Sequence, residues 1–318
     1  MVWIVVFLVI ALAFGLAILV NVNRWRSARR VAREMRALVA VPPSGLPCPD
    51  AGELPPPVAR YRRLAVGDRA PVRTLQLRHG GTFCMSPTAK AAPIRGTQLF
   101  TADPPGFIWT GRIRMAPGAW VDARDMFVAG KGSMLVLLDD TVPIADARGP
   151  QLDQGSALRL LAEMVWYPTS LFDARTVTWS AIDADHARAT LRFKEGEVSG
   201  IFEFGPDGLP VRMTAERFTD KGELRPWGGV YRDFRAVSGM LVPFEAEVAW
   251  QLETGPFTYA HWLVDSMEYD EELTVIPSPA LKTIKAAHTR AWHDVPERQR
   301  QRQRSRKRLR PRGRRRGR

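Results

Sequence analysis

Cysteine is scarce in this chain. Of its 318 residues only two are cysteines, which is too few for a disulfide framework or for a metal site built from thiolates. Cys48 lies in a proline-rich stretch and Cys84 in a predicted strand. A bridge between the two stays open as an alternative to two free thiols.

Motifs for catalysis and for cofactor binding are also missing. None of the five histidines pairs with another at helical spacing or lies beside a cysteine, so we expect no metal site. The chain contains no Gly-x-Ser-x-Gly nucleophile motif and no glycine-rich dinucleotide fingerprint. We therefore expect no cofactor, and these absences favour a binding or scaffold protein over an enzyme.

Acidic residues are absent from the end of the chain. Residues 298–318 hold thirteen of the 46 Lys and Arg and none of the 33 Asp and Glu. The rest of the chain therefore has equal numbers of basic and acidic residues, and the net charge of +13 belongs to the tail. We predict a disordered tail that binds anionic lipid or nucleic acid, or that has no partner; it has no aromatic residue for base stacking.

Charge is absent from residues 1–23, and residues 2–20 are a continuous apolar run. This run is close to the ~20 residues that a helix needs to cross the hydrocarbon core of a bilayer. A cleaved secretory signal is the alternative, but no basic residue precedes the run and no small-residue cleavage site follows it. We therefore predict a retained, single-pass transmembrane anchor.

A basic cluster follows the apolar run and is offset only by Glu34. The positive-inside rule places such a cluster, and with it the bulk of the chain, in the cytoplasm; an exported domain behind the anchor is the alternative. Apolar residues at helical spacing in residues 24–40 predict either a helix lying on anionic lipid or a continuation of the membrane helix. The arginines expected to meet lipid headgroups are Arg24, Arg26, Arg29, Arg30, Arg33 and Arg36.

The clearest repeating pattern lies between residues 176 and 269. Apolar and polar side chains alternate in residues 186–194 and again in 244–253, which places the apolar ones on one face of a sheet. Short turns rich in Gly, Pro and Asp separate the runs, so we predict seven antiparallel strands. A further β region is predicted over residues 72–147.

One helix is predicted within the β region, over residues 156–166. It has a wide apolar face, with Ser156 as its N-cap and Pro168 ending it. The predicted fold is mainly β: a curved, half-barrel-like antiparallel sheet with one covering helix, preceded by a transmembrane helix. The predicted parts are an anchor (1–23), a basic juxtamembrane helix (24–40), a proline-rich linker (41–57), the β domain (58–270), a C-terminal extension (271–297) and the tail (298–318).

Several segments together resemble a family of uncharacterised bacterial proteins, classed as a domain of unknown function. The resemblance spans residues 58–269 and implies a bacterial membrane protein, but it implies no catalytic residue. The predicted sheet and helix are also similar in fold to the half-barrels of lipoprotein carriers. The segments are FTADPPGFIWTGRIRMAPG (100–118), DMFVAGKGSM (125–134), ADARGPQLDQGSALRLLAEMVWYPTSL (145–171), MTAERF (213–218), PWGGVYRDF (226–234) and MLVPFEAEVAW (240–250).

A one-sided apolar sheet under a single helix predicts a site for an apolar or amphipathic, lipid-like ligand between them. The residues expected to line this site are Trp109, Arg148, Glu163, Trp166, Tyr167 and Trp227. For Arg148, an ion pair with Asp146, Asp153 or Glu163 is the alternative. Two other functions stay open: a hydrolase-like enzyme using Glu163, Arg148 and a strand carboxylate, and a membrane scaffold that acts through the tail.

Overall fold

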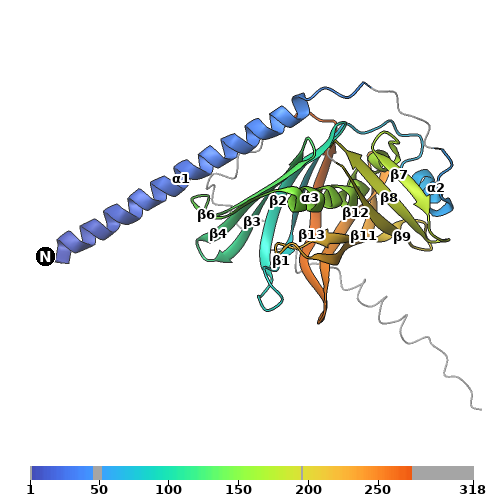
Figure 1. Cartoon of the computed structure of the whole chain (residues 1–318). Coiled ribbons are helices and arrows are strands. Elements are labelled where there is room, and N and C mark those ends of the chain that lie inside the picture. Colours follow the sequence, from blue (N-terminus) through green and yellow to red (C-terminus); the bar gives the residue numbers. More distant parts are fainter. Residues whose placement is uncertain (1, 46–51, 195, 274–318) are drawn as a thin grey trace, which may run out of the picture. The chain divides into compact units, whose positions relative to one another are not determined.

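The computed structural model describes residues 2–45, 52–194 and 196–273 (Figure 1). The predicted tail, most of the predicted extension and Cys48 lie outside these residues. The helices are α1 (Val2–Ala40), α2 (Pro56–Ala65), α3 (Pro150–Glu163) and the 3-10 turns η1 (Met164–Trp166) and η2 (Pro168–Phe172). The strands are β1 (Thr74–Phe83), β2 (Ala92–Ala102), β3 (Pro105–Ala116), β4 (Ala119–Val128), β5 (Lys131–Leu138), β6 (Val142–Arg148), β7 (Val177–Ala181), β8 (His186–Phe193), β9 (Gly196–Phe204), β10 (Pro210–Phe218), β11 (Leu224–Val237), β12 (Met240–Leu252) and β13 (Gly255–Tyr269).

All thirteen described strands form one antiparallel sheet that is not closed. Their order is β6-β5-β4-β3-β2-β1-β13-β12-β11-β10-β9-β8-β7. Every neighbouring pair except β1 and β13 is consecutive in the chain, as expected for strands joined by short turns. The predicted fold class is confirmed, including the seven strands of the second half, β7 to β13.

Helix α3 connects the two edges of the sheet. The chain leaves the sheet at edge strand β6, runs through α3, η1 and η2, and re-enters at the opposite edge strand β7. On the way α3 packs against β4, β5 and β6 on one side and against β9 and β10 on the other. The helix therefore lies across one face of the sheet, here called the covered face (Figure 1).

The predicted start of this helix was wrong. The helix begins at Pro150 after Gly149, whose φ of 123° suits glycine. The carboxylate of Asp153 in the first turn accepts a hydrogen bond from the backbone N–H of Gly132 at 2.7 Å, which holds this end of α3 on β5. Ser156 is fully buried in the interior of the helix and does not cap it.

The first helix is continuous from Val2 to Ala40, and its first half is long and apolar enough to cross a membrane. Its basic second half therefore continues the apolar helix. There, Leu38 is buried against Leu99 of β2 and Ile108 of β3, on the face of the sheet opposite to α3. Ion pairs from Glu34 to Arg124 and from Arg24 to Asp139, the latter at 3.1 Å, add to this contact.

Helix α2 begins two residues before the predicted start of the β domain at Val58, because Pro56 and Pro57 occupy its first turn. Its Tyr61 is fully buried between the rings of Phe172 and Phe204, with centroid distances of 5.8 and 5.9 Å. The covered face, α2, α3, η1 and η2 share one hydrophobic core.

Candidate functional site

The covered face of the sheet holds a charged network in an otherwise apolar interior. Arg159 projects from α3 and donates hydrogen bonds to Asp125 of β4 at 2.7 Å, to Glu163 one helical turn further on at 2.8 Å, and to the amide oxygen of Gln98 on β2 at 3.1 Å. The amide nitrogen of Gln98 in turn donates to Glu163 at 2.7 Å. Two aromatic rings flank the guanidinium group, those of Phe107 at 4.9 Å and Trp109 at 5.0 Å.

This network leaves polar atoms without a partner. Oδ1 of Asp125 and the hydroxyl of Tyr167 are buried with no hydrogen-bond partner among the described residues. Burial raises the pKa of Glu163, although Arg159 and Gln98 act to lower it. Burial also raises the pKa of the Tyr167 hydroxyl, and the nearby carboxylate of Glu163 adds to this effect. An unpaired polar atom in an apolar interior costs about 1–3 kcal/mol.

Trp109 lies beside the network and is held by a second buried contact. Its indole N–H donates to Nε2 of His79 at 2.9 Å, and burial lowers the pKa of His79 to about 4. A side chain at Gly96 or at Gly111, which lie opposite each other on β2 and β3, would collide with these rings. Gly96 and Gly111 are therefore glycines because the rings of His79 and Trp109 leave no room for a Cβ atom.

The other predicted aromatic residues also lie in the core. The indole N–H of Trp166 donates to the carbonyl of Pro243 at 3.1 Å, and that of Trp227 donates to the hydroxyl of Tyr259 at 3.0 Å. Both indoles are buried, as is Tyr167. These side chains line the interface of the sheet with α3 and η1, where they are packed against other side chains.

The structure does not bring Glu163 and Arg148 together. Arg148 ends β6 just before α3, whereas Glu163 is the last residue of α3. A helix of this length separates them by roughly 20 Å, beyond the reach of an acid–base pair. Arg148 is exposed and lies 3.7 Å from Asp146, one of its predicted alternative partners. The hydrolase-like arrangement built on Glu163 and Arg148 was therefore wrong.

Arg148 instead borders an open cleft of about 550 Å³, which is lined mainly by α1, β4, β5 and the start of α3. Its charged residues are partly paired, with Lys131 3.2 Å from Asp153 and Glu34 bound to Arg124. A second cleft, of about 520 Å³, lies beside α3 and is lined by strands β8 to β11. Neither cleft is lined by the four aromatic residues predicted to bind a ligand.

The arginines of α1 are placed in different ways. Arg24 is half-buried in its ion pair with Asp139, and the guanidinium of Arg29 lies 3.8 Å from the ring centroid of Trp25. The remaining members of the basic cluster are exposed, namely Arg26, Arg30, Arg33 and Arg36. Contact of these exposed side chains with lipid headgroups stays a prediction.

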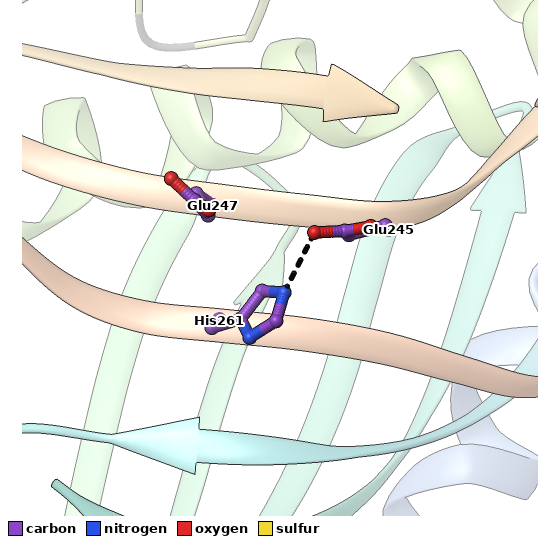
Figure 2. Close-up of side chains that lie close together, drawn as sticks. All are labelled: Glu245, Glu247 and His261. Atoms are coloured by element: carbon purple, nitrogen blue, oxygen red, sulfur yellow. Dashed lines mark hydrogen bonds and ion pairs between the residues drawn. The ribbon is translucent and has the colours of Figure 1, made fainter. Parts of the chain in front are cut away.

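A second group of titratable side chains lies on the outer face, opposite to α3 (Figure 2). Glu245 and Glu247 project from β12, and His261 lies directly opposite Glu247 on β13. Nε2 of His261 is 3.0 Å from Oε1 of Glu245, and one possible ligand atom from each of the three residues lies within 4.8 Å of the others. Arg232, opposite Glu245 on β11, is 2.7 Å from Glu247 and 3.5 Å from Glu245.

Sequence reasoning missed the partners in both groups. The spacing of Arg159 and Glu163 on a helix was visible, but Asp125 and Gln98 are polar residues at inward positions of distant strands. The alternation of residues 244–253 places Glu245 and Glu247 on one face, whereas His261 joins them only through the register of β12 with β13. Without strand register, histidine spacing along the chain gives no signal of this kind.

Comparison with known proteins places the chain in a family. Residues 46–262 match the model of a family of unknown function (DUF6544), and the chain belongs to that family. This agrees with the resemblance found in the sequence. None of the curated proteins matches the chain.

Two solved structures are similar to the chain, in line with the expected likeness to lipoprotein carriers. A LolA superfamily protein from Nitrosomonas europaea is 12% identical, with a TM-score of 0.38, and the match covers 70% of this chain and 96% of that one. A putative outer membrane lipoprotein-sorting protein domain from Vibrio parahaemolyticus is 9% identical, also with a TM-score of 0.38, over 63% of this chain and 87% of that one.

Proposed function

We propose that the protein is a membrane-anchored β domain that binds an apolar or amphipathic ligand between the covered face and α3. The observation that carries the proposal is a pair of polar atoms that have no hydrogen-bond partner among the described residues and lie among buried aromatic rings. They are Oδ1 of Asp125 on β4, beneath α3, and the hydroxyl of Tyr167, which lies between η1 and η2. A ligand with an apolar body and a polar head inserted there would keep aromatic contact and offer these atoms a partner.

Entry of such a ligand requires α3 to move away from the sheet, because packed side chains occupy their interface. Within the charged network, the bonds that cross this interface run from Arg159 to Asp125 and Gln98, and from Gln98 to Glu163. Further bonds between the sheet and α3 hold Asp153, Gln154 and the carbonyl of Ala162. The bond between Arg159 and Glu163 lies within α3 and persists when the helix moves. Since Glu163 stays with the guanidinium as its counter-charge, displacement of α3 leaves the Asp125 carboxylate without its charged partner. A ligand head with a positive charge or a hydrogen-bond donor can then pair with this carboxylate.

The proposal is tested by photo-cross-linking in membranes. Full-length protein in cells is labelled with a fatty acid that carries a diazirine and an alkyne, and the labelled peptides are identified by mass spectrometry. We expect labels on the peptide containing Trp109 and on the α3 peptides, in addition to the apolar half of α1. Labels confined to α1 would contradict the proposal, because a membrane helix meets lipid whatever the domain binds.

A matched pair of variants sharpens the experiment. Ala162 is buried on α3, and Ala162→Trp fills the interface, whereas Ala236→Trp on β11 adds the same bulk at an exposed position. Labelling of the Trp109 peptide is expected to fall in the first variant and to persist in the second. Equal labelling in the wild type and both variants would show that lipid reaches the peptide by another route.

We further propose that the β domain lies in the cytoplasm and that the N-terminus of the chain, at the start of α1, lies outside the cell membrane. The support is the basic second half of α1, in which Arg26, Arg30, Arg33 and Arg36 are exposed. Cysteine-reactive reagents that do not cross membranes test this. Cys84 is the reporter, in a Cys48→Ala variant, and labelling only after the cells are broken is expected. Labelling of intact spheroplasts would place the domain on the exported side.

A further inference from the structure

The outer-face group of Glu245, Glu247 and His261 lies at the middle of the sheet (Figure 2). β13 is the seventh of the thirteen strands in spatial order, with β12 on one side and β1 on the other. Backbone pairing on both sides fixes the positions from which these three side chains project. The side chains are about one-third exposed, at 30% for Glu245 and 33% each for Glu247 and His261, so solvent and ions reach them.

We propose that these three residues bind a divalent metal ion, with Zn²⁺ as the preferred ion. Zn²⁺ is bound by histidine nitrogen and by carboxylate oxygen, and a site with three protein ligands leaves a coordination position open for water. Their ligand atoms already lie within 4.8 Å of one another, so small rotations of the side chains bring them to one ion. Carboxylates alone would suit Mg²⁺ or Ca²⁺, whereas the imidazole favours Zn²⁺.

Arg232 is the competitor for this site. Its guanidinium group lies 2.7 Å from Glu247 and 3.5 Å from Glu245, and it neutralises part of their charge. The Arg232 side chain is 46% exposed, so its ion pairs are weak and it can turn into solvent. A divalent ion therefore displaces the guanidinium group from the two carboxylates. Because an ion of charge +2 then takes the place of a group of charge +1, the net charge around Glu245 and Glu247 rises by one.

Arg232 also gives the proposal a distinctive signature. If the group is only a surface ion-pair network, Arg232→Gln weakens it and has no bearing on metal ions. If the group is a metal site, Arg232→Gln removes the competing charge, and Zn²⁺ binds about tenfold more tightly. The inference does not depend on the ligand proposed beneath α3, because the two sites lie on opposite faces of the sheet.

The test is titration calorimetry of the untagged full-length protein in detergent with Zn²⁺. We expect the wild type to bind one Zn²⁺ ion per chain. We expect this binding to be lost in Glu247→Gln and in His261→Gln. Each change removes a direct ligand and costs more than the ~10–100-fold that is typical of losing an outer-shell partner. His186→Gln is the matched control, because His186 also pairs with a carboxylate, that of Asp183 at 2.9 Å, but belongs to no such three-residue group among the described residues.

Two outcomes overturn the proposal. The first is the absence of a heat change with Zn²⁺ in the wild type. The second is binding that is unaffected by His261→Gln, which would place the ion elsewhere in the chain. Because all these substitutions are at partly exposed positions, circular dichroism melting of each variant is expected to match the wild type, and the binding data then report on the site alone.

Discussion

Replacing Arg159 with methionine is expected to destabilise the protein more strongly than any exposed arginine substitution. The change leaves the carboxylates of Asp125 and Glu163, whose side chains are 2% and 11% exposed, without their shared counter-charge. Removing one partner of a buried ion pair costs about 3–5 kcal/mol. For a domain of this size the melting temperature should fall by roughly 10 °C.

The pH dependence of this loss gives a second signature. The pKa of Glu163 is already raised by burial, and it rises further once Arg159 is gone. A carboxyl group with a raised pKa in the folded state favours folding below its unfolded pKa, and this contribution disappears as the pH rises through the folded pKa. The deficit of Arg159→Met is therefore larger at pH 8 than at pH 5.

The measurement is thermal unfolding of the full-length protein in detergent, followed by circular dichroism at both pH values. Arg192→Met is the matched control, because Arg192 is 60% exposed and its ion pair with Glu197 is long, at 3.7 Å. In a triple variant that adds Asp125→Asn and Glu163→Gln, most of the stability should return, since no unpaired charge remains. The reasoning is refuted if Arg159→Met is no less stable than Arg192→Met, or if the triple variant is as unstable as the single one.

Three further predictions follow from the described contacts and from the tail. Burial lowers the pKa of His79 to about 4, so the free energy of unfolding of the wild type falls by up to about 3 kcal/mol as the pH falls from 6.5 to 4. His79→Gln should reduce this dependence of the unfolding free energy on pH, and an unchanged dependence would contradict the prediction. Gly111→Ala pushes a methyl group into the ring of Trp109 and should cost about 1–3 kcal/mol in denaturant unfolding, whereas Gly196→Ala, which has room for the methyl group, is the control. Deleting residues 298–318 should abolish salt-dependent binding to anionic vesicles or nucleic acid, and binding that persists would exclude the tail as its source.

The sequence by itself determined the local features of this protein. Alternation with a period of two identified the strands of residues 186–194 and 244–253, because successive side chains of any strand point to opposite faces. The uncharged run of residues 2–20 identified the candidate membrane span, because the length and composition of a segment alone show whether it is able to cross a bilayer. These signals lie within one segment and need no knowledge of the rest of the chain.

The tertiary structure decided which segments meet. β1 pairs with β13, almost two hundred residues away, and α3 joins opposite edges of the sheet, so that Arg159 reaches Asp125. The same strand register sets His261 opposite Glu247. Such pairings depend on how apolar faces are buried across the whole domain, and many registers are compatible with the same local alternation. Both candidate sites are therefore products of packing, and their members are far apart or unremarkable in the sequence.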